Sequence, residues 1–222
     1  ISFGTDVVFE TASVASVAAT FDSANNKVVI AYKDEGNSSY GTAIIGTVSG
    51  TAISFGTAAV FEAASTTYIT ATFDSNANKV AIAYKDNGTT YGTAIVGTVS
   101  GTSISFGTAV VFETASVNYL TATFDSSSNR VVISYSDAGN SSHGTSIAGT
   151  ISGTSISFGT PVVFEATSTT YITATFDSVN NKTVTAYQNS ATYGSAVVSN
   201  IPNLLTIGTD YFVQGDGTLS TT

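Results

Sequence analysis

Four copies of one sequence unit make up most of this chain. The segment ISFGT begins at Ile1, Ile53, Ile104 and Ile156, so successive copies lie 52, 51 and 52 residues apart. An FDS segment and a tyrosine keep the same period. They recur at Phe21, Phe73, Phe124 and Phe176 and at Tyr32, Tyr84, Tyr135 and Tyr187. Three markers in one register indicate a single supersecondary unit that is repeated along the chain.

Each unit is expected to contain four short β-strands and almost no helix. In the second unit, residues 68–73 (YITATF) alternate between two faces with a period of two. Residues 74–79 form a turn rich in Asp, Ser and Asn, which bond their own backbone. The other expected strands cover 80–84, 91–99 and 104–112, and the last of them is expected to bend at Gly107.

A unit of this size with four antiparallel strands matches one blade of a β-propeller. Kelch blades have about 50 residues, whereas leucine-rich repeats have about 20 to 29 and an immunoglobulin-like sandwich needs about 100. The chain begins with a lone fourth strand (1–9) and ends its last unit with strands one to three. We therefore predict an all-β, four-bladed propeller over residues 1–200, in which the N-terminal strand (within 1–10) closes the ring against the strands of 11–200.

Residues 201–222 depart from the repeat. Residues 201–203 are predicted to be a linker, and the segment after them a short β-hairpin extension that turns at Gly215, Asp216 and Gly217. The chain has no Met and opens in the middle of a motif, which favours a processed product or a fragment that has lost any signal peptide.

The composition excludes several classes of protein. Fifteen Asp and Glu against six Lys and Arg give a net charge of −9, which argues against nucleic-acid binding and against a polybasic membrane anchor. The chain has no Cys, and so neither disulfides nor thiolate metal sites nor a cysteine nucleophile. Its single histidine, His143, argues against a catalytic triad and a zinc site. We expect no enzymatic activity, no cofactor and no metal.

Acidic residues recur in every unit, and we interpret them as scaffold. Symmetric copies should have equal environments, whereas a catalytic carboxylate pair needs two different pKa values. The Asp22 turn and its copies are interpreted as hairpin turns in which Asp22 and Lys27 form a weak surface ion pair. Calcium binding stays an alternative, although these turns lack the Gly and the closing Glu of an EF-hand loop.

The loop between the second and third strands carries most of the length variation, and we treat it as the candidate binding site. An acid, amides, hydroxyls and an aromatic side chain in one loop suit a sugar, and loops on one face of a repeat scaffold often bind ligands. The alternative is a solvent-exposed loop without a function. The candidate ligand-binding residues are Asp34, Tyr40, Asp86, Tyr91, Asp137, His143 and Tyr193.

Units such as TATFDSNANKVAIAY and YGTAIVGTVSGTSISFGT resemble tandem repeats of tail-fibre and other virion structural proteins of marine bacteriophages. The segment GTDYFVQGDGTL is similar to a GxxYYVQxDGTL segment near the C-terminus of such proteins, with Phe212 in place of the second Tyr. The resemblance implies a non-enzymatic structural or adhesion protein, in a virion or extracellular, which contacts host-surface glycans and other virion or fibre subunits. Oligomers are possible. A secreted bacterial lectin-like propeller is the alternative, and a glycan hydrolase a weaker one.

Overall fold

The computed structural model describes residues 1–202, 212–213 and 219–220, and within these the protein is built of antiparallel β-strands. The first unit contains β1 (Val14–Asp22), β2 (Lys27–Asp34), β3 (Tyr40–Ser49) and β4 (Ala52–Phe55). The second contains β5 (Ala59–Asp74), β6 (Lys79–Asp86), β7 (Tyr91–Ser100) and β8 (Ser103–Phe106). The third contains β9 (Val110–Asp125), β10 (Arg130–Asp137), a single 3-10 turn (Ala138–Asn140), β11 (His143–Ser152) and β12 (Ser155–Phe158). The fourth contains β13 (Val162–Ser168), β14 (Thr170–Asp177), β15 (Lys182–Gln188) and β16 (Gly194–Ser199).

The strands β1 to β16 form four sheets, one after another along the chain. Sheet A consists of β1, β2, β3, β4 and the first half of β5, and sheet B of the second half of β5, β6, β7, β8 and the first half of β9. Sheet C consists of the second half of β9 with β10, β11, β12 and β13. Sheet D contains only β14, β15 and β16. The long strands β5 and β9 therefore each belong to two sheets.

The change from one sheet to the next occurs within a few residues. In β5, the Thr66 N–H donates to the carbonyl of Ser39 in sheet A (3.1 Å), whereas the Ser65 carbonyl accepts from the N–H of Asn87 next to sheet B (2.8 Å). No loop is needed at this point, because the backbone groups on the two edges of one strand face two different partners.

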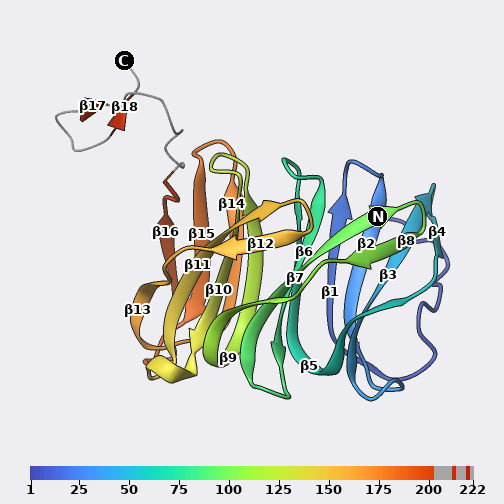
Figure 1. Ribbon diagram of the computed structural model, residues 1–222, viewed down its shortest axis with the longest axis horizontal. Coiled ribbons are helices and arrows are strands. Elements are labelled where there is room, and N and C mark those ends of the chain that lie inside the picture. Colours follow the sequence, from blue (N-terminus) through green and yellow to red (C-terminus); the bar gives the residue numbers. More distant parts are fainter. Residues whose placement is uncertain (203–211, 214–218, 221–222) are drawn as a thin grey trace.

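The four sheets stack face to face from one end of the molecule to the other (Figure 1). Sheet A, in blue, and sheet D, in orange and red, occupy opposite ends of this stack. Corresponding first strands are neighbours: the Ala122 N–H donates to Thr70 Oγ1 (3.0 Å), and the Ala174 N–H to Thr121 Oγ1 (3.3 Å). Each sheet thus contacts the sheets before and after it.

The predicted ring is not present. Residues 1–12 contain no strand, and among the described residues β16 pairs only with β15. The N-terminal residues instead lie against sheet A, where Phe9 packs on Tyr32 with ring centroids 5.2 Å apart. Sheet D is at the far end of the stack, so the N-terminal segment cannot reach it within one chain. The prediction that residues 1–9 close a four-bladed propeller was therefore wrong, whereas the all-β class is confirmed.

The local predictions agree with the structure more closely. The strands expected over 80–84 and 91–99 correspond to β6 and β7. The strand expected over 104–112 breaks at Gly107, where the backbone approaches the Thr154 carbonyl so closely that a side chain would not fit. What the prediction missed is that the second part of this strand runs on without a loop into the first strand of the next unit, as the 16 residues of β9.

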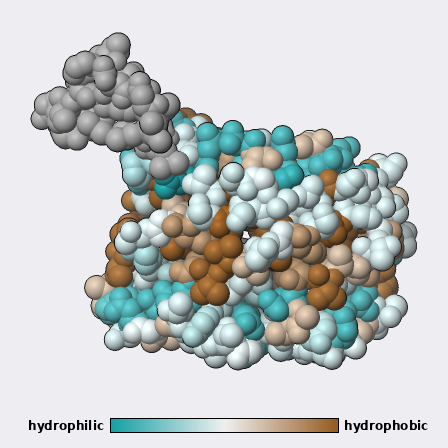
Figure 2. Space-filling view, viewed as in Figure 1, coloured by the Kyte–Doolittle hydropathy of each residue, from teal (hydrophilic) through white to brown (hydrophobic). Residues whose placement is uncertain are grey.

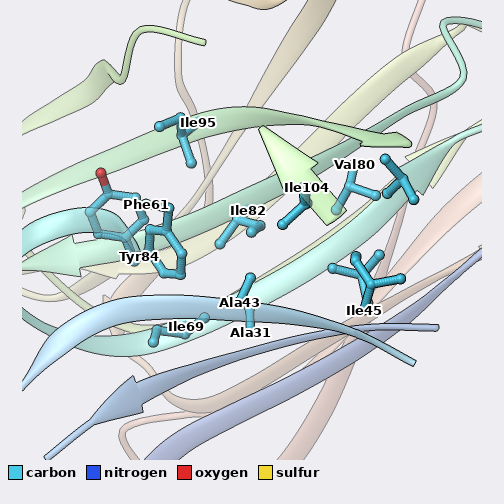
Figure 3. Packing of buried hydrophobic residues seen from close by; sticks show 12 residues of the cluster. Ala31, Ala43, Ile45, Phe61, Ile69, Val80, Ile82, Tyr84, Ile95 and Ile104 are labelled. Atoms are coloured by element: carbon cyan, nitrogen blue, oxygen red, sulfur yellow. The ribbon is translucent and has the colours of Figure 1, made fainter. Parts of the chain in front are cut away.

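Aromatic and aliphatic side chains fill the space between sheets. The Phe61 ring lies directly over Gly41 of its own sheet and packs on Tyr84 of the next sheet, with ring centroids 5.2 Å apart. Figure 3 shows Phe61 beside Tyr84, with Ile82 and Ile104 further along the same cluster. Phe112 and Tyr135 repeat this arrangement between sheets B and C. At each of these interfaces, a glycine on the third strand of the sheet makes room for a phenylalanine ring from the long strand paired with it.

The C-terminal extension is described only in part. β17 (Phe212–Val213) and β18 (Leu219–Ser220) pair in antiparallel fashion, as a hairpin requires. The predicted turn at Gly215, Asp216 and Gly217 lies outside the described residues.

Candidate functional site

The predicted loop residues gather in pairs at one edge of the sheets. Asp34, Asp86 and Asp137 are the last residues of β2, β6 and β10, and Tyr40, Tyr91 and His143 are the first residues of β3, β7 and β11. Asp34 faces Tyr40 across the strands, and Asp137 faces His143. Each acid thus lies beside the aromatic residue of its own unit, and among the described residues no hydrogen bond joins these pairs across units.

The carboxylates of these pairs hold their own loops. Asp86 accepts from the Gly88 N–H through Oδ1 and from Thr89 Oγ1 through Oδ2, both at 2.8 Å. Asp137 accepts from the N–H groups of Gly139 (2.9 Å) and Asn140 (3.2 Å), and burial raises its pKa. These carboxylates act as turn caps, which is a structural role.

The fourth unit keeps this geometry with an amide instead of an acid. Asn189 Oδ1 accepts from the N–H groups of Ala191 and Tyr193, both at 3.0 Å. Tyr193 precedes β16, in the last sheet of the stack, and is 70% exposed. It is the only tyrosine of the predicted site with an open ring face, since Tyr40 and Tyr91 are half-buried.

A buried tyrosine joins each sheet to the glutamate that precedes it. The Tyr84 hydroxyl donates to Glu62 Oε2 (2.8 Å), and the three equivalent pairs lie at 3.2 to 3.4 Å. Burial, together with the nearby Glu10, raises the pKa of Tyr32 to about 12. The pKa of Tyr84 is also raised, mainly by burial and then by its hydrogen bond to Glu62. Each of these pairs joins the tyrosine of one sheet to the glutamate of the preceding segment.

The acids of the first turn also differ from expectation. Asp74 is 1% exposed, and its Oδ1 accepts from the N–H groups of Asn76 (2.9 Å) and Ala77 (2.8 Å), which confirms the expected turn. The predicted ion pair between Asp22 and Lys27 was wrong, because the Lys27 ammonium donates to Thr47 Oγ1 (3.0 Å) instead. Among the described residues the single ion pair joins Lys33 and Glu35.

Equivalent acids do not have equal environments. Burial raises the pKa of Asp74, whereas the Asn180 side chain lowers the pKa of Asp177, the half-buried copy in sheet D. The expectation of symmetric environments was wrong, because no other described sheet stacks on the outer side of sheet D. Even so, the part of the chain that the structure describes holds no group of three or more metal-ligating side chains.

A row of tyrosines on the first strands was missed by the sequence reasoning. Tyr68, Tyr119 and Tyr171 lie on three successive sheets, with ring centroids 5.6 and 5.4 Å apart. Each has a positive φ of 52° at a β-bulge, a strained conformation for a bulky side chain. Ser16 takes this position in sheet A, with φ 49°. The signal in the sequence is the recurrence of Tyr at one position in three units.

The comparisons with known proteins add no relative. No protein-family model matches the sequence, and no curated protein matches it. In the described part of the chain, the structure contains no helix of the length and apolarity needed to cross a membrane.

Proposed function

We propose that this protein is a non-enzymatic structural and adhesion module of a phage tail fibre or similar virion appendage, which contacts glycans on a host surface. One observation carries the proposal: the repeated acids are engaged in turns and sheet contacts, while the tyrosines form a continuous row along the stack. The resemblance of the repeats to tail-fibre sequences supports the setting, in a virion or outside a cell.

The tyrosine row suits an extended ligand. Tyr68, Tyr119 and Tyr171 form a row of successive rings, in which Tyr68 and Tyr119 are half-buried and Tyr171 is 70% exposed. An aromatic ring offers an apolar face to the C–H face of a sugar, and its hydroxyl remains free for a hydrogen bond. Hydroxyl groups of the same strands, such as that of Thr173, add polar partners. A polysaccharide that follows the stack would contact one tyrosine in each of sheets B, C and D, and Ser16 in sheet A.

The test separates the tyrosine row from the loop site predicted from the sequence. A glycan array with the full chain, followed by titration of the best ligand, should show binding that falls at least tenfold in Tyr119→Ser and Tyr171→Ser. Serine is the matched replacement, because Ser16 already occupies the equivalent position with the same backbone. Tyr91→Ser and Tyr193→Ser test the loop site. Loss of binding only in these two variants would show that the glycan binds at the loops and not at the tyrosine row.

Two further outcomes would overturn parts of the proposal. No binding to any host polysaccharide at millimolar concentration would remove adhesion and leave a purely structural role. Hydrolysis of a bound glycan, if abolished by Asp86→Asn, would show an enzyme instead. Peptides of the protein in purified virions would support the virion setting, and their restriction to a bacterial secretome would favour a secreted lectin.

A further inference from the structure

The two ends of the stack are complementary to each other. Residues 1–10 correspond to 53–62, which complete sheet A by pairing with β3. Residues 1–8 are exposed and contain no strand, and Ile1 and Phe3 have almost no cover. At the other end, sheet D has a third strand, β16, but no described segment on its outer edge.

The exposure of β16 shows that no described strand covers the outer edge of sheet D. Residues 41–46 of β3 and 92–97 of β7 are buried throughout, whereas the equivalent residues 194–199 of β16 alternate between half-buried and exposed. A phenylalanine ring covers Gly41, Gly92 and Gly144, but nothing lies within 4 Å of the position that a side chain would take at Gly194. Within residues 1–202, the edge and face of β16 are therefore those of a third strand without its partner.

A cavity lies where the side chains of a fourth strand of sheet D would be expected. It has a volume of about 310 Å³, lies between sheets C and D, and is lined by Val162, Phe164, Val197 and Ile201 among others. Between sheets A and B the corresponding cluster contains Ile104 and Phe106 of β8. No described residue of sheet D provides this isoleucine and phenylalanine, so the cavity fits an Ile-Ser-Phe segment.

We propose that a second copy of this chain fills the site with its own residues 1–10, so that molecules associate head to tail. Ile1 and Phe3 of the second copy would enter the cavity, and Phe9 would cover Gly194 while it keeps its contact with Tyr32 of its own chain. The sheet A of the second copy then stacks on sheet D as one repeat stacks on the next. The hydrophobic band in Figure 2 runs along the middle of the stack, between hydrophilic loop edges.

The register follows from the internal repeats. The pairs Thr42–Val60 and Ala43–Ala59 of sheet A predict that Ser195 pairs with Val8 and Ala196 with Val7 of the second copy. The pair Val48–Ile53 predicts that Ile201 faces Ile1. Ser199 replaces the glycine that lies under Ile53 in sheet A, and its small side chain requires only a shift of a flexible isoleucine end.

This interface differs from the glycan site and is tested without a glycan. The chain has no cysteine, so a pair of engineered cysteines reports one contact. Val8→Cys with Ser195→Cys places thiols on directly opposite residues of the proposed strand pair, within reach of a disulfide. Val8→Cys with Val179→Cys is the matched control, because Val179 is 87% exposed and its equivalent Asn76 is exposed even between two neighbouring sheets.

Mild oxidation at high protein concentration should give a ladder of disulfide-linked dimers and larger species for the first pair and not for the control. Phe3→Asp on this background should reduce the ladder at least fivefold, without changing the melting temperature of the monomer. If the disulfide forms only within single chains and no dimers appear, the proposal is overturned in favour of ring closure within one chain. Absence of any link, or an equal ladder in the control, would also overturn it.

Discussion

Tyr84 connects two sheets through both its ring and its hydroxyl. The ring packs on Phe61, and the hydroxyl donates to Glu62 Oε2 at 2.8 Å. Both partners come from the preceding sheet, although they lie 22 or more residues earlier in the chain. Because a fully buried hydroxyl needs a partner, this hydrogen bond fixes how the two sheets are oriented.

Replacement of this hydroxyl should destabilise the protein. Tyr84→Phe leaves the ring in place and deprives the Glu62 carboxylate of its donor, which should cost about 1–2 kcal/mol. Tyr32→Phe is the matched control, since its hydrogen bond to Glu10 is longer, at 3.4 Å, and should contribute less. Melting temperatures compare the two variants. An equal decrease in melting temperature in both variants would show that the distance between the oxygens does not determine how much the hydrogen bond stabilises the protein.

The buried tyrosines also predict the response to alkaline pH. The folded protein holds the pKa of Tyr32 at about 12, above the unfolded value of 10.0. Between these values the unfolded chain has lost the proton and the folded chain keeps it, so the free energy of unfolding falls as pH rises. The contribution of Tyr32 to stability should be constant between about pH 7 and 9 and fall between pH 10 and 12. Tyr32→Phe should reduce this fall, as measured by urea unfolding at each pH.

The glycine under each phenylalanine gives a matched pair of substitutions. Gly92→Ala places a methyl group against the Phe112 ring, which should cost about 1–3 kcal/mol, because the core must shift. Gly194→Ala meets nothing within 4 Å and should leave the stability of the isolated molecule nearly unchanged. If the head-to-tail interface forms, Gly194→Ala should weaken association. Melting temperature and sedimentation velocity separate these effects.

At the level of elements, the β-bulge on each first strand shows two opposing effects. The positive φ of Tyr119 costs about 1–2 kcal/mol for a residue with a side chain. Its ring contacts both Tyr68 and Tyr171, and each such aromatic pair contributes about 0.5–1.5 kcal/mol. The ring contacts and the area that they bury offset the backbone strain.

A tyrosine-to-glycine substitution at this bulge should therefore change the melting temperature by different amounts at Tyr119 and at Tyr171. Tyr119→Gly relieves strain but loses two ring contacts, and we expect a clear decrease in melting temperature. Tyr171→Gly relieves the same strain and loses one contact, so its effect should be near zero. Thermal unfolding followed by circular dichroism compares them. A larger decrease in Tyr171→Gly than in Tyr119→Gly would show that ring stacking does not stabilise the bulge.

The predictability of these elements depends on the range of the interactions. Alternation and turn residues are local, so β6, β7 and the turn after Asp74 could be predicted, and Gly107 was recognised as a bend although the strand ends there. Closure of the stack could not be predicted, because it depends on packing between sheets, such as that of Phe61 on Tyr84. The tyrosine row was missed for a similar reason: the bulge at Tyr68 breaks the alternation from which that strand was predicted.

At the scale of the molecule, the main contacts of each of sheets A to D within residues 1–202 are with its neighbours in sequence, as in other repeat arrays. Sheets B and C have neighbours on both sides, whereas sheet D has only sheet C among the described residues. Hydrogen exchange should therefore be slower in β6 and β10 than in β15, the equivalent strand of sheet D. Equal protection in all three strands would indicate one cooperative unit instead of a series of sheets.

A head-to-tail contact between identical molecules is a heterologous interface, which produces either a closed ring or an open filament. The interfaces between sheets A to D do not close these four sheets into a ring. We therefore expect an open filament from the head-to-tail contact. Each long strand, β5 and β9, passes unbroken from one sheet into the next. Tension between the two ends would therefore be carried from sheet to sheet by the covalent backbone, and a filament of such molecules would lengthen only when whole sheets give way, one at a time.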